Sequence, residues 1–139
     1  MTLVLHATPQ EVMGAVEALQ ALGQALRIPE KQIFGLALAL EECASNIVNH
    51  AYQRDARQTF RVTFESTANR VSLELRDHGP AFDPTQAPVI EKQGDDDRLP
   101  GGWGIQLVRR YVDEVRYARE RNENVLRLVK HFEPATGQK

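Results

Sequence analysis

Three polar residues share one stripe of a predicted helix, and their side chains suit phosphate or metal chemistry. Glu42, Asn46 and Asn49 stand at positions i, i+4 and i+7, a spacing that places side chains on one face of an α-helix. A helix that packs on a sheet gains nothing from a carboxylate and two carboxamides in a row unless something polar lies in front of them. The stripe therefore indicates either a ligand site or the solvated side of a surface helix, which is the common arrangement.

A second candidate lies where an apolar strand is predicted to end. Asp77 closes this strand and is followed by His78 and Gly79. A strand end holds a side chain rigidly, and a glycine allows a flat ligand to approach the backbone. The same D-x-G pattern is also ordinary turn chemistry. On its own, this segment favours a simple turn over a binding group.

A glycine cluster, Gly101-Gly102-Trp103-Gly104, precedes another predicted helix. Free backbone N–H groups at a helix N-terminus form an anion site suited to phosphates, and glycine permits close approach. The cluster lacks the lysine of a P-loop, and Leu107 stands where a dinucleotide fingerprint needs a third glycine. The cluster therefore predicts a phosphate site that belongs to neither of those two motifs.

The elements that must position these residues follow from hydrophobic periodicity. Thr8-Pro9 and Pro29 each precede an apolar stripe with three- and four-residue spacing, which predicts a helix. The expected helices span residues 9–27, 30–52 and 103–111, and the expected strands span residues 2–6, 59–65, 70–76, 113–119 and 124–132. The connection between Asp77 and Gly102 is long and polar, and its part from 82 to 100 is expected to form a lid over a ligand.

These elements predict one α+β domain over residues 1–139, a two-layer α/β sandwich whose helices cover one face of a mixed, mostly antiparallel sheet. A chain of 139 residues with 42% hydrophobic content suits a single core. The single cysteine, Cys43, excludes an internal disulfide, is expected to be an ordinary small buried residue, and forms no zinc-ligand set with the four scattered histidines.

Charge and hydropathy exclude two classes of partner. The formal charge of −2 comes from 17 basic and 19 acidic residues that are interspersed, so no broad positive field is present and no direct nucleic-acid ligand is expected. The first residues lack the features of a signal peptide, and no run approaches the ~20 apolar residues of a membrane span. A cytoplasmic location without membrane contact is expected.

The order and spacing of the three polar segments resemble the N, G1 and G2 boxes of the GHKL, or histidine-kinase-like, ATPase superfamily. Within that superfamily, three patterns resemble the anti-sigma-factor serine/threonine kinases of bacterial partner-switching systems. These patterns are E-x-x-x-N-x-x-x-H-A-Y from Glu42 to Tyr52, R-D-x-G from Arg76 to Gly79, and G-G-x-G-I-x-L-V from Gly101 to Val108. The resemblance covers nearly the whole chain and implies the GHKL fold.

The resemblance also implies ligands and residue roles. Glu42 would be the general base, Asn46 the Mg²⁺ ligand and Asp77 the acceptor for the adenine amino group of ATP. A nucleotide-binding role is further expected for Asn49, Gly79, Arg98, Gly101, Gly102 and Gly104. His50 and Tyr52 are expected to serve helix-end packing or capping. The implied partners are a sigma factor and a small anti-sigma-factor antagonist that is phosphorylated, and a homodimer is possible.

Two departures from the family pattern keep an alternative open. Kinases of this family often carry an arginine before the last glycine pair and a threonine on the final strand near the base. Here Pro100 occupies the first position and the final strand begins Asn124-Val125. Arg98 would have to supply the missing charge from the lid, because phosphate-charge stabilisation is worth orders of magnitude in rate. The alternative is a catalytically weak or inactive anti-sigma binding module that exchanges partners without phosphotransfer.

Overall fold

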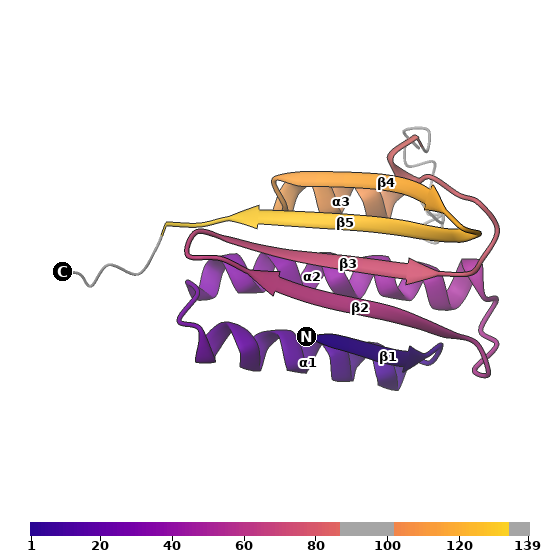
Figure 1. Ribbon diagram of the computed structural model, residues 1–139, viewed down its shortest axis with the longest axis horizontal. Helices are drawn as coiled ribbons and strands as arrows, with labels where there is room; N and C mark the ends of the chain where they lie inside the picture. The colour runs from indigo at the N-terminus through magenta and orange to yellow at the C-terminus, as the bar shows by residue number, and fades with distance from the viewer. Residues whose placement is uncertain (87–101, 134–139) are drawn as a thin grey trace, which may run out of the picture.

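In the part of the chain that the structure describes, five strands form one antiparallel sheet, and the helices lie against one of its faces (Figure 1). The computed structural model describes residues 1–86 and 102–133. The strands, in the sheet order β1-β2-β3-β5-β4, are β1 (Thr2–His6), β2 (Thr59–Ser66), β3 (Arg70–Asp77), β5 (Glu123–His131) and β4 (Glu114–Glu120). The predicted two-layer α+β architecture is confirmed. Every strand pair within the described ranges is antiparallel, where a mixed sheet was expected.

Within residues 1–86 and 102–133, three α-helices form the second layer. They are α1 (Pro9–Ala25), α2 (Glu30–Asn46) and α3 (Gly102–Tyr111), and a short 3₁₀ helix, η2, spans Pro84–Gln86. The start of α1 follows the predicted signals, since Thr8 Oγ1 accepts a hydrogen bond from Glu11 N at 3.2 Å and Pro9 takes the first helical position. In the part of the chain that the structure describes, no helix is both long and apolar enough to span a membrane.

Part of the predicted site lies outside the described residues. Arg98, Gly101 and most of the predicted lid fall within residues 87–101. The described start of that segment, residues 82–86, contains the 3₁₀ turn η2.

The second helix changes its geometry before its predicted end. It is α-helical only to Asn46 and continues as a π-helical segment, η1 (Ile47–Ala51). Gln53 and Arg54 then take positive φ values of 49° and 63°, which ends the helix. A π segment has a wider turn than an α-helix, so side chains beyond Asn46 leave the stripe that the α-helical spacing predicts. The expectation of one regular helix over residues 30–52 is corrected accordingly.

A tight hairpin sets the register of the last two strands. Arg121 and Asn122, between β4 and β5, have φ values of 51° and 66°, as a two-residue type I′ turn requires. This turn places Tyr117 opposite Leu126 and Arg119 opposite Asn124. On its other side, β5 pairs with β3 so that Asn124 lies opposite Asp77. The end of the sheet therefore brings together side chains that are far apart in the sequence.

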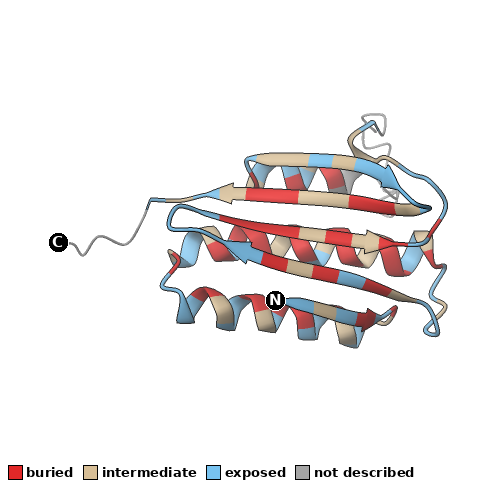
Figure 2. Ribbon diagram, viewed as in Figure 1, coloured by how far each residue is buried: buried red, intermediate tan, exposed pale blue. Residues whose placement is uncertain are grey.

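The core lies between the helical layer and the inward face of the sheet. Figure 2 shows buried residues alternating with intermediate or exposed ones along β2, as its sequence pattern predicts. The predicted apolar stripe of the second helix is buried at Ile33, Leu36, Leu40, Ala44 and Ile47, and Ala51 packs against the same cluster. Burial of this stripe against the sheet holds α2 in place and so fixes the position of Asn46 at its end.

A truncation in this stripe tests the core. Leu36 is fully buried, so Leu36→Ala should lower the free energy of unfolding by about 2–5 kcal/mol, because a cavity is left behind. Urea denaturation followed by circular dichroism measures this change. Met13→Ala removes a side chain that is 44% exposed on α1 and should change the free energy by less than about 0.5 kcal/mol. Equal effects of the two substitutions would contradict the assigned packing.

Candidate functional site

An apolar cavity of about 440 Å³ opens where the end of the second helix meets the ends of β3 and β5. This volume is within the range of roughly 300–1,000 Å³ that is typical of small-molecule sites. The lining combines apolar side chains with a few polar ones and consists of Cys43, Asn46, Ile47, His50, Ala51, Asp77, Pro80, Ala81, Phe82, Pro84, Ile105, Tyr117, Asn124 and Leu126. Apolar walls with a small number of placed polar groups suit a flat heterocyclic ligand.

Asp77 supplies a carboxyl group to this cavity. The alternation of β3 turns Asp77 inward with Leu73 and Leu75, and only 6% of the residue is exposed. Its Oδ1 atom accepts hydrogen bonds from Gly79 N at 2.8 Å and from Asn124 Nδ2 at 3.0 Å. None of the residues in the described ranges donates to Oδ2. Asp77 can therefore accept a hydrogen bond from a ligand amino group, which is the role that the sequence predicted.

Asn46 brings a carboxamide to the same cavity from the end of α2. The described residues hold no group of three or more histidine, cysteine or acidic side chains that could bind a metal ion. Asn46 could give a metal ion one carboxamide oxygen, and ligand phosphates and water could supply further ligands. This arrangement fits Mg²⁺, which commonly keeps waters and phosphate oxygens among its ligands.

Glu42 and Asn49 do not line the cavity. Glu42 lies one turn before Asn46 and is partly buried. Burial raises the pKa of Glu42, repulsion from Glu41 raises it further, and His50 partly offsets both effects. Asn49 is exposed, and its Oδ1 accepts a hydrogen bond from Arg54 Nε at 3.2 Å. The π-helical turn separates Asn49 from the predicted polar stripe, so Asn46 and Asp77 share the cavity without it.

The glycines of the predicted site lie in two different structural environments, a tightly packed strand end and the start of a helix. Gly79 is buried but does not line the cavity, and a Cβ atom on it would lie 2.7 Å from Ala51 Cβ. A glycine is thus needed for the strand end to pack against η1, rather than for ligand approach as the sequence suggested. Gly102 begins α3 and Gly104 lies in its first turn, so this glycine pair opens a helix as predicted. Ile105, from the same turn, lines the cavity.

Several lining residues were not among the predicted site residues. Asn124 and Leu126 come from β5 and Tyr117 comes from β4. Asn124 stands in the inward-facing series of β5 with Leu126 and Leu128, so strand alternation could have identified a polar residue among buried ones. Cys43 is buried as expected, but it also lines the cavity, and burial raises the pKa of its thiol to about 12.

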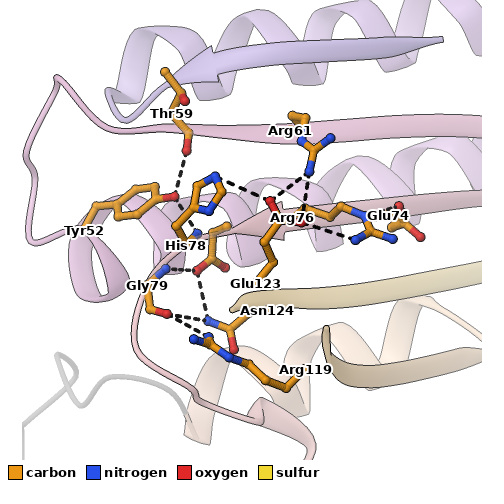
Figure 3. Close-up of polar contacts among 11 residues, drawn as sticks. Tyr52, Thr59, Arg61, Glu74, Arg76, His78, Gly79, Arg119, Glu123 and Asn124 are labelled. Carbon is orange, nitrogen blue, oxygen red and sulfur yellow. Dashed lines mark hydrogen bonds and ion pairs between the residues drawn. The ribbon is translucent and has the colours of Figure 1, made fainter. Parts of the chain in front are cut away.

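Tyr52 joins the end of the second helix to two strands (Figure 3). Its hydroxyl donates to Thr59 O at 2.7 Å and accepts from His78 N at 2.8 Å. Burial raises the pKa of this hydroxyl. The predicted structural role of Tyr52 agrees with these contacts, and the bond to His78 holds the backbone next to Asp77. His50, in contrast, is exposed and lines the cavity instead of packing at the helix end.

The fold and the site define a nucleotide-binding type of domain, and comparison with known families agrees. Residues 5–130 match the family described as "Histidine kinase-like ATPase domain". The chain belongs to this family, and the predicted superfamily is confirmed.

Individual relatives specify the branch of the family. The chain is 33% identical over 135 residues to the serine/threonine-protein kinase BtrW of Bordetella bronchiseptica, a match that covers 96% of this chain and 94% of that protein. It is 30% identical over 90 residues to the serine-protein kinase RsbW of Bacillus subtilis, covering 61% of this chain and 56% of that protein. These similarities confirm the predicted enzyme class, ATP-dependent serine/threonine protein kinases.

A solved structure shares the fold. The RsbU and RsbW domains of Rv1364c from Mycobacterium tuberculosis superpose with a TM-score of 0.64 at 17% identity, covering 97% of this chain and 34% of that chain. At this identity the match shows a common fold alone.

The contribution of the Tyr52 hydroxyl to stability can be tested by one conservative substitution. Tyr52→Phe leaves the partly buried groups Thr59 O and His78 N without this partner, so the free energy of unfolding should fall by about 1–3 kcal/mol. Urea denaturation measures the loss. Tyr111→Phe is the matched control, because the Tyr111 hydroxyl makes no hydrogen bond to the described residues, and it should leave the stability unchanged. A Tyr52→Phe protein as stable as the wild type would show that water replaces the bridge.

Proposed function

We propose that the chain is an anti-sigma factor and serine/threonine protein kinase, acting as a single domain over residues 1–139. It would use Mg²⁺-ATP to phosphorylate a small anti-sigma-factor antagonist and would alternatively sequester a sigma factor. The observation that carries the proposal is the shared apolar cavity of Asp77 and Asn46, whose carboxyl and carboxamide groups could serve as a base acceptor and a metal ligand. Membership of a histidine kinase-like ATPase family supports ATP as the ligand.

The proposed reaction moves one phosphoryl group. A hydroxyl oxygen of the antagonist attacks the γ-phosphorus of ATP, and the bond from that phosphorus to the bridging oxygen of ADP breaks. The hydroxyl proton passes to the Glu42 carboxylate, and ADP leaves. Such transfers depend mainly on positioning and on charge stabilisation, and they need little covalent help from the protein.

Different residues would bind the adenine, the Mg²⁺ ion and the phosphates of ATP. Asp77 would accept the adenine amino group, while Ile47, Phe82 and Leu126 would cover the ring. Asn46 would hold Mg²⁺, which when bound neutralises charge on the phosphates. The backbone of α3 at Gly102 and Gly104 would face phosphate oxygens, since a helix N-terminus attracts anions.

Phosphotransfer and partner binding can both be tested in a direct assay. The purified chain is incubated with labelled Mg²⁺-ATP and a candidate antagonist, and phosphate transfer to a serine or threonine is followed. Sigma-factor binding is measured in parallel with and without the antagonist. Transfer together with competitive sigma-factor release supports the proposal. Sigma-factor binding without any transfer would instead establish the alternative, a catalytically inactive binding module. The oligomeric state, for which a homodimer is proposed, is read from light scattering.

Calorimetry can test the adenine-binding role of Asp77 separately from the Mg²⁺-binding role of Asn46. Asp77→Asn should weaken ATP binding by about 10- to 100-fold, because a charge-assisted hydrogen bond is lost. Asn46→Ala should weaken binding only when Mg²⁺ is present, so the Mg²⁺ dependence of the affinity should shrink. Asn49→Ala is the matched control and should bind normally, since Asn49 is outside the cavity. A wild-type chain with no affinity for millimolar ATP would refute both roles.

The role of Glu42 as the base makes a prediction about rate and pH. Glu42→Gln should bind ATP but lose phosphotransfer by about 100- to 10,000-fold. Because the pKa of Glu42 is raised, its ionised, base-competent form is lost as pH falls through that raised value, and wild-type kcat should decline there. Glu41→Gln is the control and should keep its rate at neutral pH. It should also move the decline to lower pH, because Glu41 contributes to the raised pKa.

A further inference from the structure

Asn124 is a buried carboxamide that shares the inward face of β5 with two leucines. On the inward face of β5 it precedes Leu126 and Leu128, and only 6% of the residue is exposed. Burying a carboxamide costs free energy unless its hydrogen-bonding groups find partners. Its neighbour across the sheet is Asp77, which faces the same cavity.

The carboxamide of Asn124 uses its whole hydrogen-bonding capacity within the protein. Nδ2 donates to Asp77 Oδ1 at 3.0 Å and to Pro80 O at 2.9 Å. Oδ1 accepts from Phe82 N at 3.2 Å and from the Tyr117 hydroxyl. A carboxamide has two N–H donors and an oxygen with two lone pairs, so all four positions are filled. Exchanging nitrogen and oxygen would set donor against donor, which fixes the orientation of the group.

These bonds determine what Asp77 can offer a ligand. Both lone pairs of Oδ1 are occupied, one by Asn124 Nδ2 and one by Gly79 N. Of the described residues, none donates to Oδ2. The bonds to Pro80 and Phe82 also tie the backbone of the cavity wall to β5. Asn124 itself has no donor or acceptor left for a base, so it can act on a ligand only through these neighbours.

A carboxylate with a single available oxygen discriminates between purines. Guanine has two adjacent N–H donors on its Watson–Crick edge, which a carboxylate with two free oxygens accepts side by side. Adenine has one amino group next to a ring acceptor. With Oδ1 occupied, one guanine donor would be left without a partner in a buried site, and an unpaired buried donor costs affinity.

We propose that Asn124 is the positioning residue that sets the base specificity of this site, by occupying Oδ1 of Asp77 so that adenine is accepted and guanine rejected. This inference rests on the proposed nucleotide-binding function. The substitution Asn124→Ala frees one lone pair of Oδ1, which makes the two-donor contact to guanine available while it loosens the cavity wall. Affinity for ATP falls, and discrimination against GTP falls with it.

The test is the ratio of the GTP and ATP dissociation constants, measured by calorimetry with Mg²⁺. A purely structural role would weaken both nucleotides alike and leave the ratio unchanged. We expect Asn124→Ala to reduce the ratio by about tenfold, the effect of one unpaired hydrogen-bonding group. Asn124→Leu also removes the donor while retaining bulk beside Leu126, and it should reduce the ratio similarly. Circular dichroism shows which variants are folded.

Two controls separate an effect through Asp77 from a general one. In an Asp77→Asn background, Asn124→Ala should no longer change the ratio, since the acceptor through which it acts is gone. Asn69→Ala removes an exposed carboxamide from the turn between β2 and β3 and should leave both dissociation constants unchanged.

The results of this experiment test the inference separately from the proposed nucleotide-binding function on which it rests. A wild-type chain that binds neither nucleotide overturns the proposed function and this inference together. The inference alone is overturned if the wild-type chain binds ATP but its GTP-to-ATP ratio of dissociation constants is near one. It is also overturned if folded Asn124 variants keep the wild-type ratio. A reduced ratio that persists in the Asp77→Asn background also overturns it, because Asn124 would then act independently of Asp77.

Discussion

The two hydrogen bonds to Asp77 Oδ1, from Gly79 N and Asn124 Nδ2, hold a carboxyl group almost fully buried at the end of an apolar strand. A carboxylate in such a place needs donors, because burial removes the water that would otherwise solvate it. One donor comes from the turn that follows β3 and the other from β5. The strand order, the turn and the identity of residue 124 must therefore all be compatible with this one group, and the cavity forms around it.

The contact between the second helix and the end of β3 adds a steric constraint. Gly79 meets Ala51 so closely that a Cβ atom would overlap it, and the Tyr52 hydroxyl bridges Thr59 and the His78 backbone nearby. Both helix residues lie at or next to the π segment η1. Segments of this type are frequent at functional sites, where they redirect side chains at the end of a helix. Here the segment lets one helix end contact the strand carrying the base acceptor while Asn46 faces the cavity.

The same strand ends carry a separate ion-pair network on the outer face of the sheet. Arg76 and Glu123 flank the inward pair Asp77 and Asn124, and they contact each other at 3.3 Å. Arg61 contacts Glu123 at 2.8 Å. Burial acts to raise the pKa of Glu123, but the Arg61 and Arg76 guanidinium groups outweigh it and hold the pKa below its ordinary value. Partly exposed pairs contribute little stability individually. They place charged side chains on the outer face at this end of the sheet, opposite the face that carries Asp77 and Asn124.

The sequence by itself determined the elements and most of the chemistry. Periodicity and capping signals located the helices and strands to within a few residues, because apolar spacing and start residues such as Thr8 act locally. The three motifs identified the family, and Asp77 and Asn46 do share a cavity. Only the tertiary structure decided that Asn49 lies apart, because the change to π geometry depends on how the helix end packs. It also decided that Asn124 and Tyr117 join the site, since the strand order brings β5 beside β3 and a linear pattern contains no pairing partner. Gly79 shows the same division: its position was visible in the sequence, but the reason for it is a contact with Ala51, 28 residues earlier in the chain.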